Sequence, residues 1–246
     1  TGMTPRLLEV MAREPRIVPY LDMPMQHAAD AVLARMRRPE RQRTIRDRLA
    51  RVRAAVPDLA IRTTCIVGFP GETDDDFATL LAFLEEAQFD RVGVFTYSPQ
   101  EGTRAFGMQD DVPDAVKRER LERVTELQRM ITAERYERHI GRTVAAMIDR
   151  VEPDGTLQAR TVWQADDSDG VTRIDAGSAH RAAGSGSAGA PALTPGAILD
   201  VRIDDVVDDY DFAATLVGVR DAMPVTAPTR MRALPVMTAT VGSFGR

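Results

Sequence analysis

The chain has 246 residues, 43% hydrophobic and 28% charged, a composition that supports a folded core and excludes wholesale disorder. Its 32 lysines and arginines are outnumbered by 37 aspartates and glutamates, and the net charge of −5 excludes a generally basic protein that coats nucleic acid. The single cysteine, Cys65, cannot supply the three or four thiolates of an iron–sulfur site, and the sequence has no apolar run long enough to cross a membrane.

The first 139 residues alternate between strand-like and helix-like segments. Short strands are predicted at residues 16–21, 60–67 and 91–97, and the second of these is rich in β-branched side chains. Strands that alternate with helices at this spacing build a parallel sheet, so this part of the chain is predicted to be α/β.

Helical patterns follow each of these strands. The helix between the first two strands has one apolar face, formed by Ile45, Leu49, Val52 and Val56. After the second strand, Thr73 and Asp76 have the spacing of a capping box, which predicts a helix start. A long helix is predicted from residue 113 to about 140, with Gly141 as its stop signal.

Three parallel strands are too few for a closed barrel of eight or for a sheet covered on both faces. Residues 4–12 already have the pattern of a helix whose preceding strand is missing, and the chain begins with Thr1 rather than Met. We therefore expect the chain to be part of a longer protein; the alternative is an unusually small α/β domain.

The pattern changes after Gly141, where five short strands follow one another without an intervening helix. They are predicted at residues 143–148, 157–163, 171–174, 198–206 and 212–219. Five short strands suggest a small all-β barrel of the OB type. A Gly/Ser/Ala-rich tract predicts a mobile loop at 177–191, and the tail at 220–246 is expected to be poorly ordered.

The three loops that follow the parallel strands are the candidates for ligand binding, because ligands bind at the carboxyl ends of such strands. Residues 68–73 combine two glycines with a helix start, which suits either close approach to a ligand or a tight capped turn. His27 follows Gln26 and is either a ligand contact or a satisfied polar residue at a helix start. Tyr97 and Ser98 could line a ring or belong to an ordinary turn.

Two other features are predicted to be structural. Cys65 lies inside a strand, where a buried and unreactive thiol is expected because no nearby group would stabilise a thiolate. Residues 35–53 contain nine arginines, which could contact phosphates but are better explained as the solvated face of a helix, since an apolar stripe runs through the same residues.

The predicted β-barrel is acidic, with six arginines against thirteen aspartates and glutamates between residues 140 and 219. The candidate partner-binding residues are Trp163, Asp204, Asp205, Asp208, Asp209 and Asp211. OB-type barrels often bind nucleic acid through basic grooves and exposed aromatics, but an acidic barrel repels phosphates and attracts a basic protein. The alternative is that the acidity serves only solubility.

The order of these segments resembles the C-terminal part of the RimO-type methylthiotransferases, which are radical S-adenosylmethionine enzymes. The resemblance covers about residues 1–219 and rests on four stretches: YLDMPMQHAADAVLARMRRP, IRTTCIVGFPGETDDDF, FDRVGVFTYSPQEGTRA and DYDF. The related MiaB type, which modifies tRNA, typically has Gln-Ser-Gly after the proline of the first stretch. Here Gln26 is followed by His27, which favours the RimO type.

The resemblance implies a partial (βα) radical-SAM barrel at residues 1–139, followed by a small OB-like barrel of the TRAM type at 140–219. It implies S-adenosylmethionine as cofactor, and 4Fe–4S clusters in the full-length family whose ligand cysteines are not in this chain. No residue here is expected to be catalytic or to bind a metal, so this chain alone is expected to be inactive. The residues implied to bind cofactor are Gln26, His27, Arg62, Gly68, Phe69, Pro70, Gly71, Glu72, Tyr97, Ser98 and Pro99.

The implied reaction adds a methylthio group to the β-carbon of an aspartate in a basic small-subunit ribosomal protein. We expect a cytoplasmic monomer that uses the acidic barrel to dock that protein, with RNA a less favoured partner. The alternatives are a MiaB-type tRNA enzyme, a nucleotide-binding α/β enzyme that uses residues 68–73 as an anion cradle, and a non-catalytic acidic module that binds a basic protein.

Overall fold

A computed structural model describes residues 3–166, 168–175, 177, 193–208 and 210–220. Residues 178–191 of the predicted loop and 221–246 of the predicted tail lie outside these described ranges, as does Asp209. Within the described part of the chain, every helix is too short or too polar to span a bilayer.

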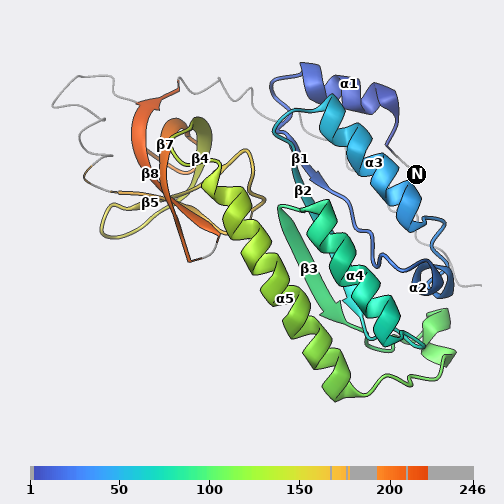
Figure 1. Cartoon of the computed structure of the whole chain (residues 1–246). Helices are drawn as coiled ribbons and strands as arrows, with labels where there is room; N and C mark the ends of the chain where they lie inside the picture. Colours follow the sequence, from blue (N-terminus) through green and yellow to red (C-terminus); the bar gives the residue numbers. More distant parts are fainter. Residues whose placement is uncertain (1–2, 167, 176, 178–192, 209, 221–246) are drawn as a thin grey trace, which may run out of the picture.

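The elements follow the predicted order, first α/β and then all-β (Figure 1). The first part comprises α1 (Pro5–Arg13), β1 (Tyr20–Asp22), α2 (Asp30–Arg35), α3 (Gln42–Ala55), β2 (Ala60–Val67), α4 (Asp74–Ala87), β3 (Arg91–Thr96), the 3-10 helix η1 (Arg104–Gly107) and α5 (Asp114–Glu137). The second part comprises β4 (Thr143–Val151), β5 (Leu157–Thr161), β6 (Thr172–Ile174), β7 (Ile198–Val207) and β8 (Asp211–Val219).

The three strands of the first part form a parallel sheet in the order β1–β2–β3, which confirms the α/β prediction. The first strand was predicted at residues 16–21, but it begins only at Tyr20. Pro19 precedes it and has no N–H to donate, although its carbonyl accepts a hydrogen bond from the Ala60 N–H. The strand therefore begins only after this proline.

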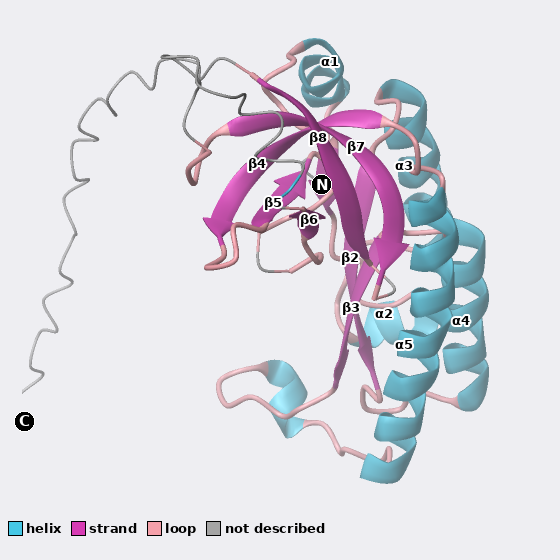
Figure 2. Ribbon diagram, turned by 90° about the vertical axis from the view of Figure 1, so that its left-hand side faces the viewer, coloured by secondary structure: helices cyan, strands magenta, loops and turns pink. Residues whose placement is uncertain are grey.

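The two faces of the sheet differ in burial. Along β2, Ile61, Thr63, Cys65 and Val67 are buried, whereas Arg62, Thr64 and Ile66 are only partly buried. Figure 2 shows α3, α4 and α5 on one side of this sheet, whereas the barrel strands and, among the described helices, the short η1 lie toward the other side. Because side chains alternate along a strand, one set packs under the helices and the other lines an open face.

The helices begin and end as their sequences predict. Thr73 and Asp76 form the expected capping box at the start of α4, with the Thr73 hydroxyl accepting from the Asp76 N–H. The apolar stripe of α3 is buried through Ile45, Leu49 and Val52. The long helix α5 ends at Glu137, just before Gly141, whose φ of 81° is left-handed and suits glycine.

The second part is a closed barrel with the strand order β4–β5–β6–β8–β7, in which β6 and β8 are parallel. This is the arrangement of an OB-type barrel and confirms the predicted fold class. Gly155, with φ of 85°, turns the β4–β5 hairpin within the sequence Pro153-Asp154-Gly155. Leu157, Ile174, Leu199 and Phe212 point into the barrel and are fully buried, which supplies its core.

The barrel docks on the amino-terminal end of the open sheet face. The buried carboxylate of Asp169 accepts hydrogen bonds from the Tyr20 hydroxyl, the Ala165 N–H and, at 3.4 Å, Arg91 Nε. The Tyr136 ring on α5 stacks on Phe212 of the barrel with 4.7 Å between ring centroids. Hydrogen bonds and apolar contacts thus join the barrel to the sheet.

Replacing Asp169 by Ala should destabilise this junction. The substitution leaves the Ala165 N–H and the Arg91 guanidinium without their buried acceptor, and removing one partner of a buried ion pair costs about 3 kcal/mol of unfolding free energy. Urea denaturation measures the change. Asp166→Ala is the matched control, because Asp166 is an exposed residue of the same loop paired with Arg160, and an exposed pair contributes less than about 1 kcal/mol. Equal losses in the two variants would contradict this account of the junction.

Candidate cofactor-binding site

The three predicted loops meet at the carboxyl end of the parallel sheet. The Ile66 N–H donates to the Gln26 carbonyl at 2.8 Å, and the Tyr97 N–H donates to the Val67 carbonyl at 2.8 Å. The Phe69 and Tyr97 rings make an edge-to-face contact with centroids 5.1 Å apart. The sequence-predicted loops after β1, β2 and β3 therefore form one continuous rim.

Glu72 organises the loop after β2. Its Oε2 accepts from the Gly68 N–H at 2.7 Å and the Phe69 N–H at 3.1 Å, and its Oε1 accepts from Arg120 at 3.0 Å. Burial raises the pKa of the Glu72 carboxyl, while Arg120 and the two backbone N–H groups oppose that rise. Arg120 also donates to Asp74 at 2.7 Å, so α5 and the start of α4 hold the loop through one guanidinium.

The two glycines of this loop are required by packing inside the protein. Gly68 has φ of 72°, and a Cβ there would lie 2.3 Å from Cγ of Lys117 on α5. Gly71 has φ of 76°, and a Cβ there would lie 3.3 Å from Nε of Arg35. Left-handed backbone favours glycine at both positions, and the nearest neighbours are side chains of this chain. The tight-turn alternative therefore accounts for both glycines without a ligand.

His27 is fully buried beneath the rim. Its Nδ1 accepts from the Ala29 N–H at 3.0 Å, which assigns the ring proton to Nε2. Nε2 has no hydrogen-bond partner among the described residues and lies 3.8 Å from Oε2 of Glu72. Burial lowers the pKa of His27 to about 4, so the imidazole is neutral at pH 7 and shapes the loop between β1 and α2.

Two adjoining cavities open at this rim. The first, of about 360 Å3, is mainly apolar and includes Phe69, Phe95, Tyr97 and Ser98 in its lining. The second, of about 270 Å3, is lined by Gln26 and by four arginines, Arg35, Arg37, Arg38 and Arg104, with no carboxylate among its lining residues. Because both cavities include Phe69 in their walls, they form a composite site with an apolar half and a cationic half.

Comparison with known proteins assigns both parts of the chain. The family model of the radical SAM superfamily matches residues 1–84, and that of the TRAM domain matches residues 140–217. The chain is 42% identical over 242 residues to ribosomal protein uS12 methylthiotransferase RimO of Anaeromyxobacter sp. (strain K), a match covering 94% of this chain and 48% of that protein. The chain is a homologue of the RimO-type methylthiotransferases over most of its own length and about half of theirs.

Further relatives agree with this assignment. The protein of the same name from Geobacter sulfurreducens is 40% identical over 219 residues, covering 88% of this chain and 46% of the relative. That from Histophilus somni is 46% identical over 169 residues, covering 69% of this chain and 38% of the relative. The chain thus spans about half the length of the first relatives it matches.

The composite site of this RimO-type chain fits S-adenosylmethionine, the cofactor that the radical SAM family implies. Aromatic walls at Phe69, Phe95 and Tyr97 suit an adenine ring, and the arginine-lined half suits the carboxylate of the methionine portion. An iron–sulfur cluster does not fit the residues present. No group of three or more His, Cys, Asp or Glu suited to a metal occurs among the described residues, and burial raises the pKa of the Cys65 thiol.

Several predicted cofactor residues lie apart from this site. Arg62 is near the amino end of β2, where its Nη1 lies 4.0 Å from Asp169 and its side chain faces the barrel junction. The structure therefore does not bring Arg62 to this site: its side chain shares the open sheet face with Thr64 and Ile66 but lies toward the amino end of β2, next to the docked barrel. Pro70 and Pro99 belong to the rim, but neither lines the two cavities.

The arginine run at 35–53 divides into two groups, which the sequence prediction missed. Arg43, Arg46 and Arg51 are exposed on α3, as a solvated helix face predicts. Arg37 and Arg38 precede that helix and line the cationic cavity instead. The apolar stripe of α3 begins only at Ile45, so it does not explain the arginines that precede it. The position of Arg37 and Arg38 before the stripe was the sequence signal that they belong to a different surface.

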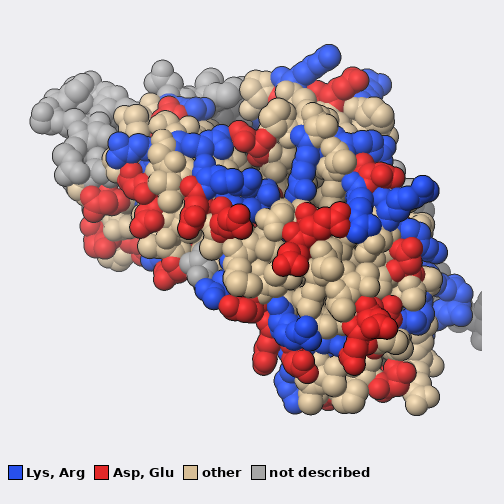
Figure 3. All heavy atoms as spheres, in the orientation of Figure 1, with Lys and Arg blue, Asp and Glu red and all other residues tan. Residues whose placement is uncertain are grey.

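The barrel of the RimO-type chain carries an acidic surface, visible at its lower edge in Figure 3. Asp204, Asp205 and Asp208 are exposed, although Asp204 also accepts from Arg202 at 2.9 Å. Asp211 is buried and accepts from the Val171 N–H at 2.9 Å, which makes it a structural residue. Of the predicted partner-binding aspartates described, Asp204, Asp205 and Asp208 are therefore the ones exposed to a partner.

Trp163 was predicted to bind a partner, and the structure corrects this. Its side chain is only 3% exposed, and its ring stacks on His139 with centroids 3.7 Å apart. The indole packs between the barrel and the end of α5, and this packing removes its large apolar surface from water. No exposed face is left for a nucleic-acid base.

The stability of the chain should decrease as the pH falls from 7 to 4, and His27 should cause part of the decrease. Its pKa is about 4 in the folded protein against an ordinary 6.5, so the unfolded chain takes up the proton first as the pH falls. The loss begins near pH 6.5, is complete near pH 4 and amounts to roughly 3 kcal/mol for this group.

In the variant His27→Asn, an amide oxygen replaces Nδ1 as the acceptor for the Ala29 N–H. The unfolding free energy of this variant, measured in urea at pH 7, 5.5 and 4, should decrease by roughly 3 kcal/mol less than that of the parent chain. His139, whose pKa is also lowered to about 4, is present in both proteins and cancels in the comparison. An unchanged pH slope would show that His27 is not held neutral by burial.

Proposed function

We propose that this chain supplies the cofactor-binding rim and the substrate-docking barrel of an enzyme that methylthiolates ribosomal protein uS12. In this proposal the methylthio group is added to the β-carbon of an aspartate. Identities of 40–46% to three relatives support the proposal, since each of them is named a ribosomal protein uS12 methylthiotransferase. The single observation that carries it is the composite cavity at the carboxyl ends of β1, β2 and β3.

In this proposal the chain's own residues bind and orient the cofactor. Phe95, which is 59% exposed on the open sheet face, and the Phe69 and Tyr97 rings would cover the adenine and exclude water from it. Arg37, Arg38 and Arg104 would hold the carboxylate. When bound and reduced, S-adenosylmethionine supplies a radical that abstracts a hydrogen atom from the substrate. That chemistry needs no general acid or base from this chain.

The acidic barrel would dock the substrate. A ribosomal protein rich in Lys and Arg is attracted by Asp204, Asp205 and Asp208, whereas the phosphates of a tRNA are repelled by the same field. This charge argument favours the RimO reaction over the MiaB-type reaction on tRNA. Because the proposed substrate is a ribosomal protein, we propose that the enzyme acts in the cytoplasm. One barrel per active site is consistent with a monomer.

Binding of S-adenosylmethionine by the chain tests the cofactor half of the proposal. The double variant Arg37→Gln/Arg38→Gln should bind the cofactor about tenfold more weakly in calorimetric titration, because it loses charge-assisted hydrogen bonds to the carboxylate. The matched control is Arg43→Gln/Arg51→Gln, which removes the same charge from the exposed face of α3. Equal weakening in both would contradict a specific carboxylate site.

A chimera tests the reaction itself. Residues 1–246 replace the matching half of RimO from Anaeromyxobacter sp. (strain K), and mass spectrometry of uS12 detects the mass of one methylthio group. We expect modification, and we expect the variant Asp204→Asn/Asp205→Asn/Asp208→Asn to raise KM with little change in kcat, an effect that shrinks at high salt. A folded chimera that binds cofactor but modifies only tRNA, or nothing, would refute the proposed substrate.

A further inference from the structure

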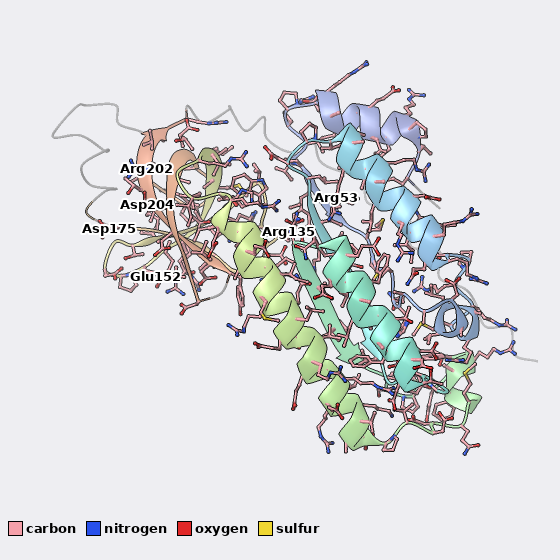
Figure 4. All side chains as sticks on the ribbon, in the orientation of Figure 1. Arg53, Arg135, Glu152, Asp175, Arg202 and Asp204 are labelled. Carbon is pink, nitrogen blue, oxygen red and sulfur yellow. The ribbon has the colours of Figure 1, made fainter. Side chains whose placement is uncertain are left out.

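A second basic cavity lies at the other end of the sheet, away from the cofactor rim. Its volume is about 260 Å3, and it forms where the ends of α3 and α5 and the start of β2 meet the barrel. Four arginines line it, Arg53, Arg135, Arg138 and Arg142, together with two carboxylates, Asp58 and Asp90. Figure 4 labels Arg53 and Arg135 on facing helices at this junction, and Figure 3 shows basic side chains gathered on the same face.

Only two of the four guanidinium groups have a carboxylate partner. Arg135 pairs with Asp90 at 2.6 Å, and Arg142 pairs with Asp58 at 2.7 Å. Arg53 donates to the carbonyls of Ala87 and Gln88, and Arg138 donates to the carbonyl of Arg135. Among the described residues, Arg53 and Arg138 make no ion pair, so the lining carries two positive charges in excess.

Nearby carboxylates offset the excess charge only in part. Burial, followed by the charge of Arg135, lowers the pKa of both Arg53 and Arg138. Asp90 opposes this effect at both arginines, and Glu134 and Asp58 also oppose it at Arg138. His139 also lines the cavity, but burial and the arginines Arg142 and Arg138 lower its pKa to about 4, so it is neutral at pH 7. An anion placed among these side chains would remove the repulsion between them.

We propose that this cavity binds a dianionic phosphate group, either as inorganic phosphate or as the terminal monoester of a nucleotide. A phosphate monoester carries a charge of about −1.5 to −2 at pH 7, which matches the excess of two positive charges. Guanidinium groups present paired donors that fit phosphate oxygens. The cavity is slightly smaller than the roughly 300–1,000 Å3 of sites for drug-sized ligands, which suits a small anion.

The cavity is distinct from the cofactor site in position and composition. The cationic half of the cofactor site is lined by residues at the carboxyl ends of the three parallel strands, and it shares no lining residue with this cavity. Phosphate binding can be measured without methylthiotransferase activity. The two proposals can therefore fail separately.

The test is calorimetric titration of the 246-residue chain with inorganic phosphate and with adenosine monophosphate, with sodium chloride at matched ionic strength as the blank. We expect saturable binding that Arg138→Gln weakens by roughly tenfold, since one charge-assisted pair of hydrogen bonds is lost. Arg123→Gln is the matched control, because Arg123 is exposed on α5 and paired with Glu119 at 3.6 Å. It should leave the affinity unchanged.

The two ligands distinguish the sources of the phosphate. Equal affinity for both indicates that the phosphate alone is recognised, and tighter binding of adenosine monophosphate indicates a nucleotide. A short RNA without a terminal phosphate should bind at least tenfold more weakly than inorganic phosphate, because each diester carries less charge. Tighter binding of that RNA, no binding beyond the salt blank, or equal losses in Arg138→Gln and Arg123→Gln would each overturn the proposal.

If Arg138→Gln does not fold, Arg138→Lys provides the second variant. It keeps the positive charge but loses the planar pair of donors, so phosphate should bind this variant more weakly than the parent chain. Circular dichroism and the urea midpoint establish folding for each variant. A folded Arg138→Lys chain with unchanged affinity would place the phosphate away from Arg138 and refute the site.

Discussion

The docking of the barrel on an open parallel sheet is the constraint on which the rest of the structure depends. Three strands with helices on one side leave an uncovered face, and the buried carboxylate of Asp169 secures the barrel against its amino-terminal end through Tyr20 and Arg91. The carboxyl-terminal end of the same face stays open, with Phe95 largely exposed. One docking contact thus divides the sheet face into a closed half that holds the protein together and an open half that is available to a ligand.

The rim at the open end divides its residues between structure and binding. The polar residues that stand out in the sequence, His27 and Glu72, are buried beneath it and hold the backbone of the loops through short hydrogen bonds. The surface that a ligand would meet comes from less conspicuous side chains, including Phe95 and the arginines before α3. Buried polar groups with partners stabilise one loop conformation, and the cavity walls depend on that conformation.

Charge is distributed unevenly over the chain. The barrel is acidic on its exposed lower edge, whereas each of two separate cavities has four arginines in its lining. A net charge of −5 therefore describes neither region, since surfaces separated by more than a Debye length of about 8–10 Å act independently at physiological salt. An acidic surface that attracts a basic protein can coexist with cationic sites for small anions in one molecule.

Local patterns were enough to predict the element order, the parallel sheet, the five-stranded barrel and the approximate ligand-bearing loops, because periodicity, capping and turn residues act over a few neighbouring positions. The order of local stretches also carried the family resemblance. The folded chain was needed to show that Trp163 is buried, that Arg62 faces the barrel and that four arginines from two helices and a loop converge on one cavity. Those outcomes depend on contacts between different elements of the fold, such as Arg62 with Asp169 and Trp163 with His139, and no local pattern encodes such contacts.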